Sequence, residues 1–263
     1  MAKKQAQQSS EITIPALKVR TMDVFIIGTQ PLVYNRLSEK ARQQLLFPPR
    51  ASRKTKDRSE EGIKHNPFEE YQNSFYLAGD GPTLCKLPTS ALKNALETAA
   101  LDADGVAKSE VSRGIWLDRR DSPVWGNPAL FMCGVRQAGI SKTPDIRTRG
   151  VLMEWASRFT LNFVEERFTV KTIMILLERA GMLSGIGDFR QEKGAGNFGQ
   201  FRTTTEEDPE FQRIVASYGR EYQLAKYAEP DFFDEETKQL YEWWIGMYRS
   251  TFSSSPKHLR QVA

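Results

Sequence analysis

A glycine-rich stretch in the second half of the chain, SGIGDFRQEKGAGNFGQF (184–201), combines residue types that suit a polyanionic ligand. Glycines permit positive φ angles and let a backbone approach a phosphodiester chain closely. The arginine and the lysine between them can neutralise phosphates, while the two inner phenylalanines can stack on bases. The predicted contacts of this loop with nucleic acid are Gly187, Phe189, Arg190, Lys193, Gly194, Gly196 and Phe198. On local chemistry alone, a long connection that only packs against a sheet is an equal alternative.

The order of elements around this stretch argues against the common nucleotide-binding loops. A Rossmann fingerprint lies between a strand and the helix that it opens, and a Walker A loop also leads into a helix. Here an apolar segment with helical periodicity, VKTIMILLERAGML (170–183), comes first, and a strand-like segment, QFRTTT (200–205), follows. The sequence therefore favours contact with a nucleic-acid chain over a bound nucleotide cofactor.

Lysines and arginines elsewhere add candidate phosphate contacts. The segment from Arg50 to Asn66 has almost no apolar residue and no periodicity, which predicts a loop that orders on binding or stays solvated. The segment KTPDIRTRG (142–150) is basic and lies near predicted strand ends. The candidates outside the glycine-rich stretch are Arg36, Arg42, Arg53, Lys54, Lys56, Arg58, Lys93, Arg147 and Arg149. A solvated surface explains several of them nearly as well.

Charge is distributed unevenly along the chain. The net charge is +4, yet residues 206–237 carry ten acidic and three basic side chains, so the remainder carries about +11. A basic body with an acidic appendage fits a polyanion-binding protein. We expect the acidic segment to contact the basic body of a neighbouring copy, which would build a head-to-tail homo-oligomer or filament.

The sequence offers little for catalysis. Its two histidines, His65 and His258, lie in polar segments without an evident group to orient them. The motifs H-E-x-x-H and G-x-S-x-G and clustered metal-binding carboxylates do not occur. Cys85 and Cys133 have neither disulfide nor zinc spacing. We therefore predict no catalytic residue, no metal and no cofactor.

The sequence has no feature that predicts a membrane protein. No window approaches 18 consecutive apolar residues. The lysine-containing start, MAKKQAQQSSE, is not followed by the apolar core of a secretory signal. We expect a cytoplasmic protein.

The expected elements give an α+β fold. In chain order they are a strand (19–33), a segment with strand character (68–88), a helix (88–101), strands (129–168), a helix (170–183), the glycine-rich loop and a strand (199–205). This order is compatible with a ferredoxin-like (RRM-like) βαββαβ core over residues 12–205, with large insertions near 47–76 and 102–150. Residues 1–11 are expected to be a disordered tail, and residues 206–263 an acidic, helical C-terminal extension.

The stretch GIGDFRQEKGAGNFG, between the second helix and the last strand, resembles the G-h-G…G-h-G loop of the RAMP superfamily, the ferredoxin-like RNA-binding proteins of CRISPR effector complexes. LPTSALKNALETAA (87–100) resembles the opening of that family's first helix, and GTQPLVYNRLSEKA (28–41) resembles the turn after its first strand. The resemblance is greatest to the backbone subunit, which polymerises along a guide RNA. The family's usual Arg-Ser-Arg-Gly core is replaced from Arg190 onward, with Glu192 where a cation or hydroxyl is expected.

This resemblance implies a non-catalytic protein that binds single-stranded RNA, assembles side by side with its own copies and contacts other effector-complex subunits. Two alternatives share the fold. One is a phage or mobile-element protein that coats or recombines single-stranded DNA, and the other is an endoribonuclease, for which Asp57 and Asp80 are candidates by position. A third is an interaction protein whose glycine-rich loop only packs. RNA and DNA stay open, since no residue is identifiable as a contact to a 2′-hydroxyl.

Overall fold

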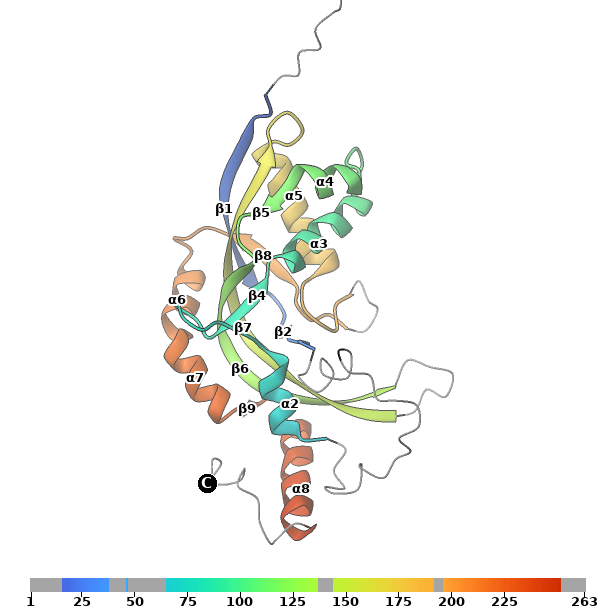
Figure 1. Cartoon of the computed structure of the whole chain (residues 1–263), viewed down its shortest axis with the longest axis vertical. Coiled ribbons are helices and arrows are strands. Elements are labelled where there is room, and N and C mark those ends of the chain that lie inside the picture. Colours follow the sequence, from blue (N-terminus) through green and yellow to red (C-terminus); the bar gives the residue numbers. More distant parts are fainter. Residues whose placement is uncertain (1–15, 38–45, 47–64, 137–143, 192–195, 252–263) are drawn as a thin grey trace, which may run out of the picture.

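A long, mostly antiparallel sheet runs through the molecule, and helices lie against both of its faces (Figure 1). The computed structural model describes residues 16–37, 46, 65–136, 144–191 and 196–251. The strands are β1 (Val19–Gly28), β2 (Leu32–Val33), β3 (Tyr76–Leu77), β4 (Cys85–Pro88), β5 (Ile115–Leu117), β6 (Asp121–Arg136), β7 (Pro144–Val164), β8 (Phe201–Thr204) and β9 (Asp231–Phe232). The helices are α2 (Pro67–Ser74), α3 (Ser90–Ala99), α4 (Lys108–Gly114), α5 (Val170–Arg179), α6 (Pro209–Ser217), α7 (Arg220–Ala228) and α8 (Glu235–Thr251), with a 3₁₀ turn η1 (Ala100–Asp102) and a π-helical turn η2 (Ala180–Ser184).

The strands follow the order β3-β4-β6-β7-β1-β8 across the sheet, while β2 and β5 also pair with β7 and β9 pairs with β6. The two longest strands, β6 and β7, form a central antiparallel hairpin. In the chain, α3 lies between β1 and β6, and α5 lies between β7 and β8. Both helices lie on the same side of the sheet (Figure 1). The chain is therefore an α+β protein, as the sequence predicted.

Helix α5 forms where the sequence predicts it. Its apolar residues recur at helical spacing and bury Ile173, Leu176 and Leu177 against the sheet. The Thr169 side chain accepts a hydrogen bond from the Thr172 amide at 3.2 Å and so caps the first turn. The helix continues into η2, which ends before Gly185 at a φ of +67°. This π-helical turn directs the chain into the glycine-rich loop.

The main core lies between the sheet and α3 and α5. Trp155 on β7 is its largest fully buried side chain, and its indole N–H donates to the Gln30 carbonyl at 2.9 Å. A Cβ at Gly28 would lie 2.0 Å from the Trp155 ring, so only glycine lets β1 cross this ring. Each fully buried side chain of this size contributes about 1.5–3 kcal/mol, so the core stabilises the sheet that carries the candidate site.

The structure differs from the sequence prediction in the range 68–88 and shows which elements occupy the range 102–150. The start of the stretch 68–88 is helical rather than extended, because Pro67 occupies the first helical position and the Asn66 side chain accepts a hydrogen bond from the Glu69 amide at 3.3 Å. The range 102–150, expected as an insertion, contains α4, β5 and β6, and β6 belongs to the central hairpin.

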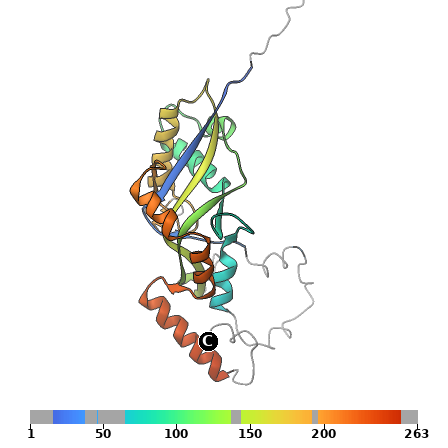
Figure 2. The same ribbon diagram turned by 90° about the vertical axis from the view of Figure 1, so that its left-hand side faces the viewer.

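The C-terminal segment contains α6, α7, β9 and α8 as far as Thr251, where the described residues end. Helix α6 buries Phe211 against Ile27, Trp125 and Ala156 on the sheet face opposite the main core. Helix α8 lies at the end of the molecule opposite α4 and α5 (Figure 1; Figure 2). None of the helices described here is long and apolar enough to cross a membrane.

Candidate nucleic-acid interface

The two ends of the glycine-rich loop meet at its base. The Ile186 amide donates to the Gly199 carbonyl at 2.9 Å, and the Gly199 amide donates to the Pro31 carbonyl at 2.8 Å. Gly199 has a φ of +73°, and a Cβ there would lie 1.7 Å from the Ile186 carbonyl oxygen. Only glycine fits this crossing, so the sequence pattern reflects a real backbone requirement.

Gly187 lies close to β2, the strand beside the loop. Its φ is +89°, and an added Cβ would lie 2.7 Å from the Val33 carbonyl oxygen. The next amide, of Asp188, donates to that same carbonyl at 2.9 Å. The missing side chain at Gly187 thus lets the loop lie along β2, and this contact fixes where Asp188 and Phe189 emerge.

Four phenylalanines gather beside this loop, and we call them the aromatic cluster: Phe131, Phe189, Phe198 and Phe233. The Phe131 ring lies 6.3 Å from Phe189, 5.8 Å from Phe198 and 4.7 Å from Phe233. All four are partly exposed. Phe189 and Phe198, predicted from the sequence, therefore belong to a larger platform. The sequence reasoning missed Phe131 on β6 and Phe233 before α8, because their contact depends on the strand pairing.

Of the two arginines predicted on β7, Arg149 contacts the same loop. Arg149 pairs directly with Phe131 across the hairpin, so both side chains lie on one face of the sheet. The Arg149 Nε atom lies 3.5 Å from Asp188 Oδ2, and its Nη1 donates to the Thr148 carbonyl at 3.1 Å. Two positions earlier, the side chain of Arg147 is 42% exposed, with its Nη2 3.4 Å from Asp145 Oδ2.

Cys133 lies in the same region, opposite Arg147 in the hairpin. Burial raises the pKa of its thiol, although the positive charge of Arg149 opposes the shift. A raised pKa keeps the thiol protonated near neutral pH, and a protonated thiol is a poor nucleophile.

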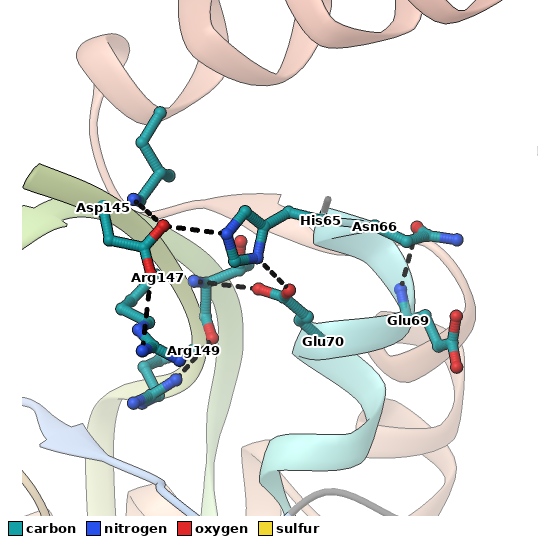
Figure 3. A network of polar contacts seen from close by, with 9 residues as sticks. His65, Asn66, Glu69, Glu70, Asp145, Arg147 and Arg149 are labelled. Atoms are coloured by element: carbon teal, nitrogen blue, oxygen red, sulfur yellow. Dashed lines mark hydrogen bonds and ion pairs between the residues drawn. The ribbon is translucent and has the colours of Figure 1, made fainter. Parts of the chain in front are cut away.

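His65 begins the described chain after the predicted basic segment and lies beside β7 (Figure 3). Its Nδ1 lies 2.6 Å from Glu70 Oε1, and its Nε2 lies 2.9 Å from Asp145 Oδ1. The expectation of a histidine without an orienting group is therefore wrong. Each ring nitrogen of His65 is therefore held by one carboxylate. The chain after the basic segment is thereby fixed next to Arg147.

The structure places the other predicted residues elsewhere or does not describe them. The amide of Arg36 donates to the Ser74 carbonyl at 2.9 Å, at the end of α2. Lys93 lies on α3, and among the described residues no hydrogen bond or ion pair joins it or Arg36 to the glycine-rich loop. Arg190 is partly buried within the loop. The residues outside the described part are Arg42, Arg53, Lys54, Lys56, Asp57, Arg58, Lys193, Gly194 and His258.

The resulting interface offers partly exposed rings next to guanidinium groups that are held by carboxylates. A guanidinium binds carboxylate and phosphate with the same planar geometry, so Arg147 and Arg149 can exchange Asp145 and Asp188 for phosphates. Rings beside such cations suit bases that follow one another along a single strand. Within the described ranges, no group of three His, Cys, Asp or Glu side chains is arranged to hold a metal ion.

No protein-family model matches this chain, and no curated protein matches it. Among solved structures it is similar to a chain of the "Cryo-EM structure of the Type III-B Cmr-beta bound to cognate target RNA", with a TM-score of 0.39 and 12% identity. The similarity covers 72% of this chain and 60% of that one, so the match spans less than two thirds of that chain's length. A likeness at this level does not establish a shared fold.

Proposed function

We propose that this chain is a non-catalytic, RAMP-type protein that binds single-stranded RNA, with copies assembling side by side as a CRISPR-type backbone. The observation that carries the proposal is the convergence of the glycine-rich loop, the aromatic cluster and the β7 arginines on one face. His65 adds to it, because the chain that leaves the basic segment is fixed beside Arg147. Rings, cations and a closely approaching backbone are the parts that single-strand binding requires.

The strand order supports a ferredoxin-like core for this proposal. A βαββαβ unit of that type places its fourth strand beside its first and its second beside its third. Strands β8, β1, β7 and β6 are neighbours in this order, with α3 and α5 as the two connecting helices. The glycine-rich loop then lies between the second helix and the last strand of the unit, where the resemblance to the RAMP superfamily expects it.

Salt-dependent binding tests the proposed interface. Fluorescence anisotropy with a labelled single-stranded RNA, and with a DNA of the same sequence, gives the slope of log affinity against log salt. Each phosphate contact on a single strand contributes about −0.7 to that slope. Arg147→Ala and Arg149→Ala should each reduce the slope by about that amount. Arg167→Ala is the matched control, because this 56% exposed arginine follows the other end of β7.

Four outcomes decide between the candidate functions. An RNA that co-purifies, resists cleavage when Mg²⁺ is added and carries more copies as it lengthens supports the guide-coating role. Preference for DNA would move the protein to a coating or recombination role, and periodic cleavage of bound RNA would make it an endoribonuclease. The absence of salt-dependent binding to either strand would refute the proposal and leave the glycine-rich loop a packing element.

The acidic C-terminal segment supplies the proposed contact between copies. Several of its carboxylates are already used within the chain, such as Asp208 and Glu210, which pair with Arg202. Glu207, Glu221 and Glu229 are exposed and have the charge to meet a basic neighbour. Their triple replacement by glutamine should reduce the number of copies per strand in light scattering without unfolding the protein. Unchanged assembly would sink the charge-based contact, whatever the result for RNA binding.

A further inference from the structure

A polar cavity lies away from the glycine-rich loop, between the outer faces of β1 and β7 and the turn that joins β3 to β4. Its volume is about 550 Å³, within the range of small-molecule sites. Its lining includes Arg158 of β7, nine residues from Arg149, which is about 30 Å along an extended strand. It shares no lining residue with the interface described above, so it is a separate feature.

An aromatic ring and two guanidinium groups line this cavity. Phe25 on β1 pairs directly with Arg158 on β7, and the two side chains therefore lie side by side on one face. Arg119 and Arg158 are exposed, and neither guanidinium has a hydrogen bond or ion pair with another described residue. Phe25 is half-buried and held edge-on by Phe211 at 5.3 Å. The Arg158 guanidinium also lies over the Trp125 ring, 5.9 Å from its centroid. A fixed ring beside two guanidinium groups that have no carboxylate partner among the described residues suits a base with its phosphate.

The carboxylates of the cavity narrow the class of ligand. Asp121 is paired with Lys86 at 2.8 Å, and Asp23 accepts a hydrogen bond from the Thr160 hydroxyl at 2.8 Å. The lining also holds the carboxylates of Asp80, in the exposed turn, and of Glu206, before α6. Both can accept hydrogen bonds from ribose hydroxyls or base amino groups. Since acidic groups slightly outnumber basic ones, a polyphosphate would be repelled. A ligand with one phosphate and several hydrogen-bond donors fits better.

The wall of the cavity is fixed before any ligand arrives. Arg220 of α7 donates hydrogen bonds to the carbonyls of Thr83 at 3.0 Å, Ala78 at 3.2 Å and Gly79 at 2.7 Å. Its amide also donates to the Pro82 carbonyl at 2.9 Å. The turn 78–83 therefore needs little ordering on binding, which lowers the entropic cost of holding a small ligand.

We propose that this cavity binds one nucleoside monophosphate unit, with the base against Phe25 and the phosphate between Arg119 and Arg158. The same unit occurs as a free nucleotide and as one nucleotide of a strand that passes over the sheet. The site does not depend on strand binding at the glycine-rich loop.

Titration calorimetry with AMP, GMP, CMP and UMP tests this site. Saturable binding of at least one nucleotide is expected, and Arg119→Ala and Arg158→Ala should each weaken it about 10- to 100-fold, as for a lost hydrogen bond to a charged group. Arg120→Ala is the matched control, since Arg120 is an exposed neighbour that does not line the cavity. All three arginines are exposed, so these variants should fold. No saturable binding, or equal weakening by Arg120→Ala, would overturn the proposal.

A second pair of measurements separates the two sources and separates this site from the proposed function. If Arg158→Ala also weakens binding of a labelled single strand, the ligand is a nucleotide of that strand. If strand binding is unchanged, the ligand is a free nucleotide. Arg149→Ala should leave mononucleotide binding unaltered. A protein that binds mononucleotides but no strand would refute the proposed function alone, while the reverse would refute this cavity alone.

Discussion

Replacing Gln223 by leucine is expected to destabilise the protein more than most single substitutions. This side chain of α7 is fully buried. Its Oε1 accepts hydrogen bonds from the amides of Leu84 at 2.8 Å and Cys85 at 2.9 Å. Its Nε2 donates to the carbonyls of Val124 at 2.8 Å and Gly126 at 3.3 Å. One amide group thus joins α7 to β4, to the turn before it and to β6.

The magnitude follows from the four partners. A buried polar group that loses its partner costs about 1–3 kcal/mol, and the long Gly126 contact lies at the low end of that range. Leucine returns roughly 1 kcal/mol through its extra apolar contact. With each of the four lost partners counted near the low end of that range, about 4–6 kcal/mol in all, the net loss in the free energy of unfolding should be about 3–5 kcal/mol, which places this variant in the tail of measured single substitutions.

Urea denaturation followed by tryptophan fluorescence measures this loss. The matched control is Gln239→Leu on α8, whose exposed side chain donates a hydrogen bond to Glu235 Oε1 at 3.4 Å. That variant should change stability by less than about 0.5 kcal/mol. A loss of less than about 1 kcal/mol in Gln223→Leu would refute the reasoning, because the backbone groups would then have found other partners. A changed urea slope would show that α7 detaches in a separate step.

Three further outcomes are expected. Gly199→Ala places a Cβ 1.7 Å from a backbone oxygen of the loop at a φ of +73°, so urea denaturation should show a loss of about 2–4 kcal/mol and anisotropy a loss of strand binding. Asp208→Asn should lower the melting temperature at pH 7 but not near pH 2. Hydrogen bonds, above all the one from the Thr204 hydroxyl, lower the pKa of Asp208 to about 2. The contribution of this carboxylate to the stability of the fold is therefore complete above about pH 4 and is lost as the pH falls through about 2. His65→Leu leaves Asp145, whose side chain is 3% exposed, without its histidine donor and should cost about 1–3 kcal/mol in urea denaturation.

Each of these outcomes has a control or a contrary result. Gly134→Ala should be nearly neutral, because no atom lies within 4 Å of the added Cβ. An equal loss in the two glycine variants would show that the crossing at Gly199 is not strained. A constant difference between wild type and Asp208→Asn from pH 7 to pH 2 would contradict the lowered pKa. If His65→Leu is neutral, the remaining contacts of Asp145 suffice to hold it.

The local sequence pattern was enough to predict some elements, such as α5, but it was misread for others, such as α2. Helix α5 could be predicted because its apolar residues repeat at helical spacing and Thr169 caps it. The start of α2 was predicted as strand because its aromatic residues suggest extended chain, whereas Asn66 and Pro67 carry the stronger helix signal. Such signals lie within a few residues of the element that they define, so a sequence reading can find them.

The candidate site needed contacts that are distant in the chain. The glycines and aromatic residues of the loop could be identified from the sequence, but the aromatic cluster forms only because β6 brings Phe131 beside Phe189. Gln223 resembles any polar residue of an amphipathic helix, and its role depends on amides 138 and 139 positions away. Partners at such separation are set by the packing of the sheet, which local periodicity does not describe.

The closed base of the glycine-rich loop bears on how this protein could diversify. Besides the crossing at Gly199, the Phe198 amide donates to the Phe189 carbonyl at 3.3 Å, so the chain between these two residues leaves and returns at one point. Doubling the length of a loop with fixed ends costs only about 0.6 kcal/mol in closure entropy. Insertions between Phe189 and Phe198 should therefore cost the fold little. This segment is the place where a library of variants could sample new specificities while the sheet beneath it keeps its fold.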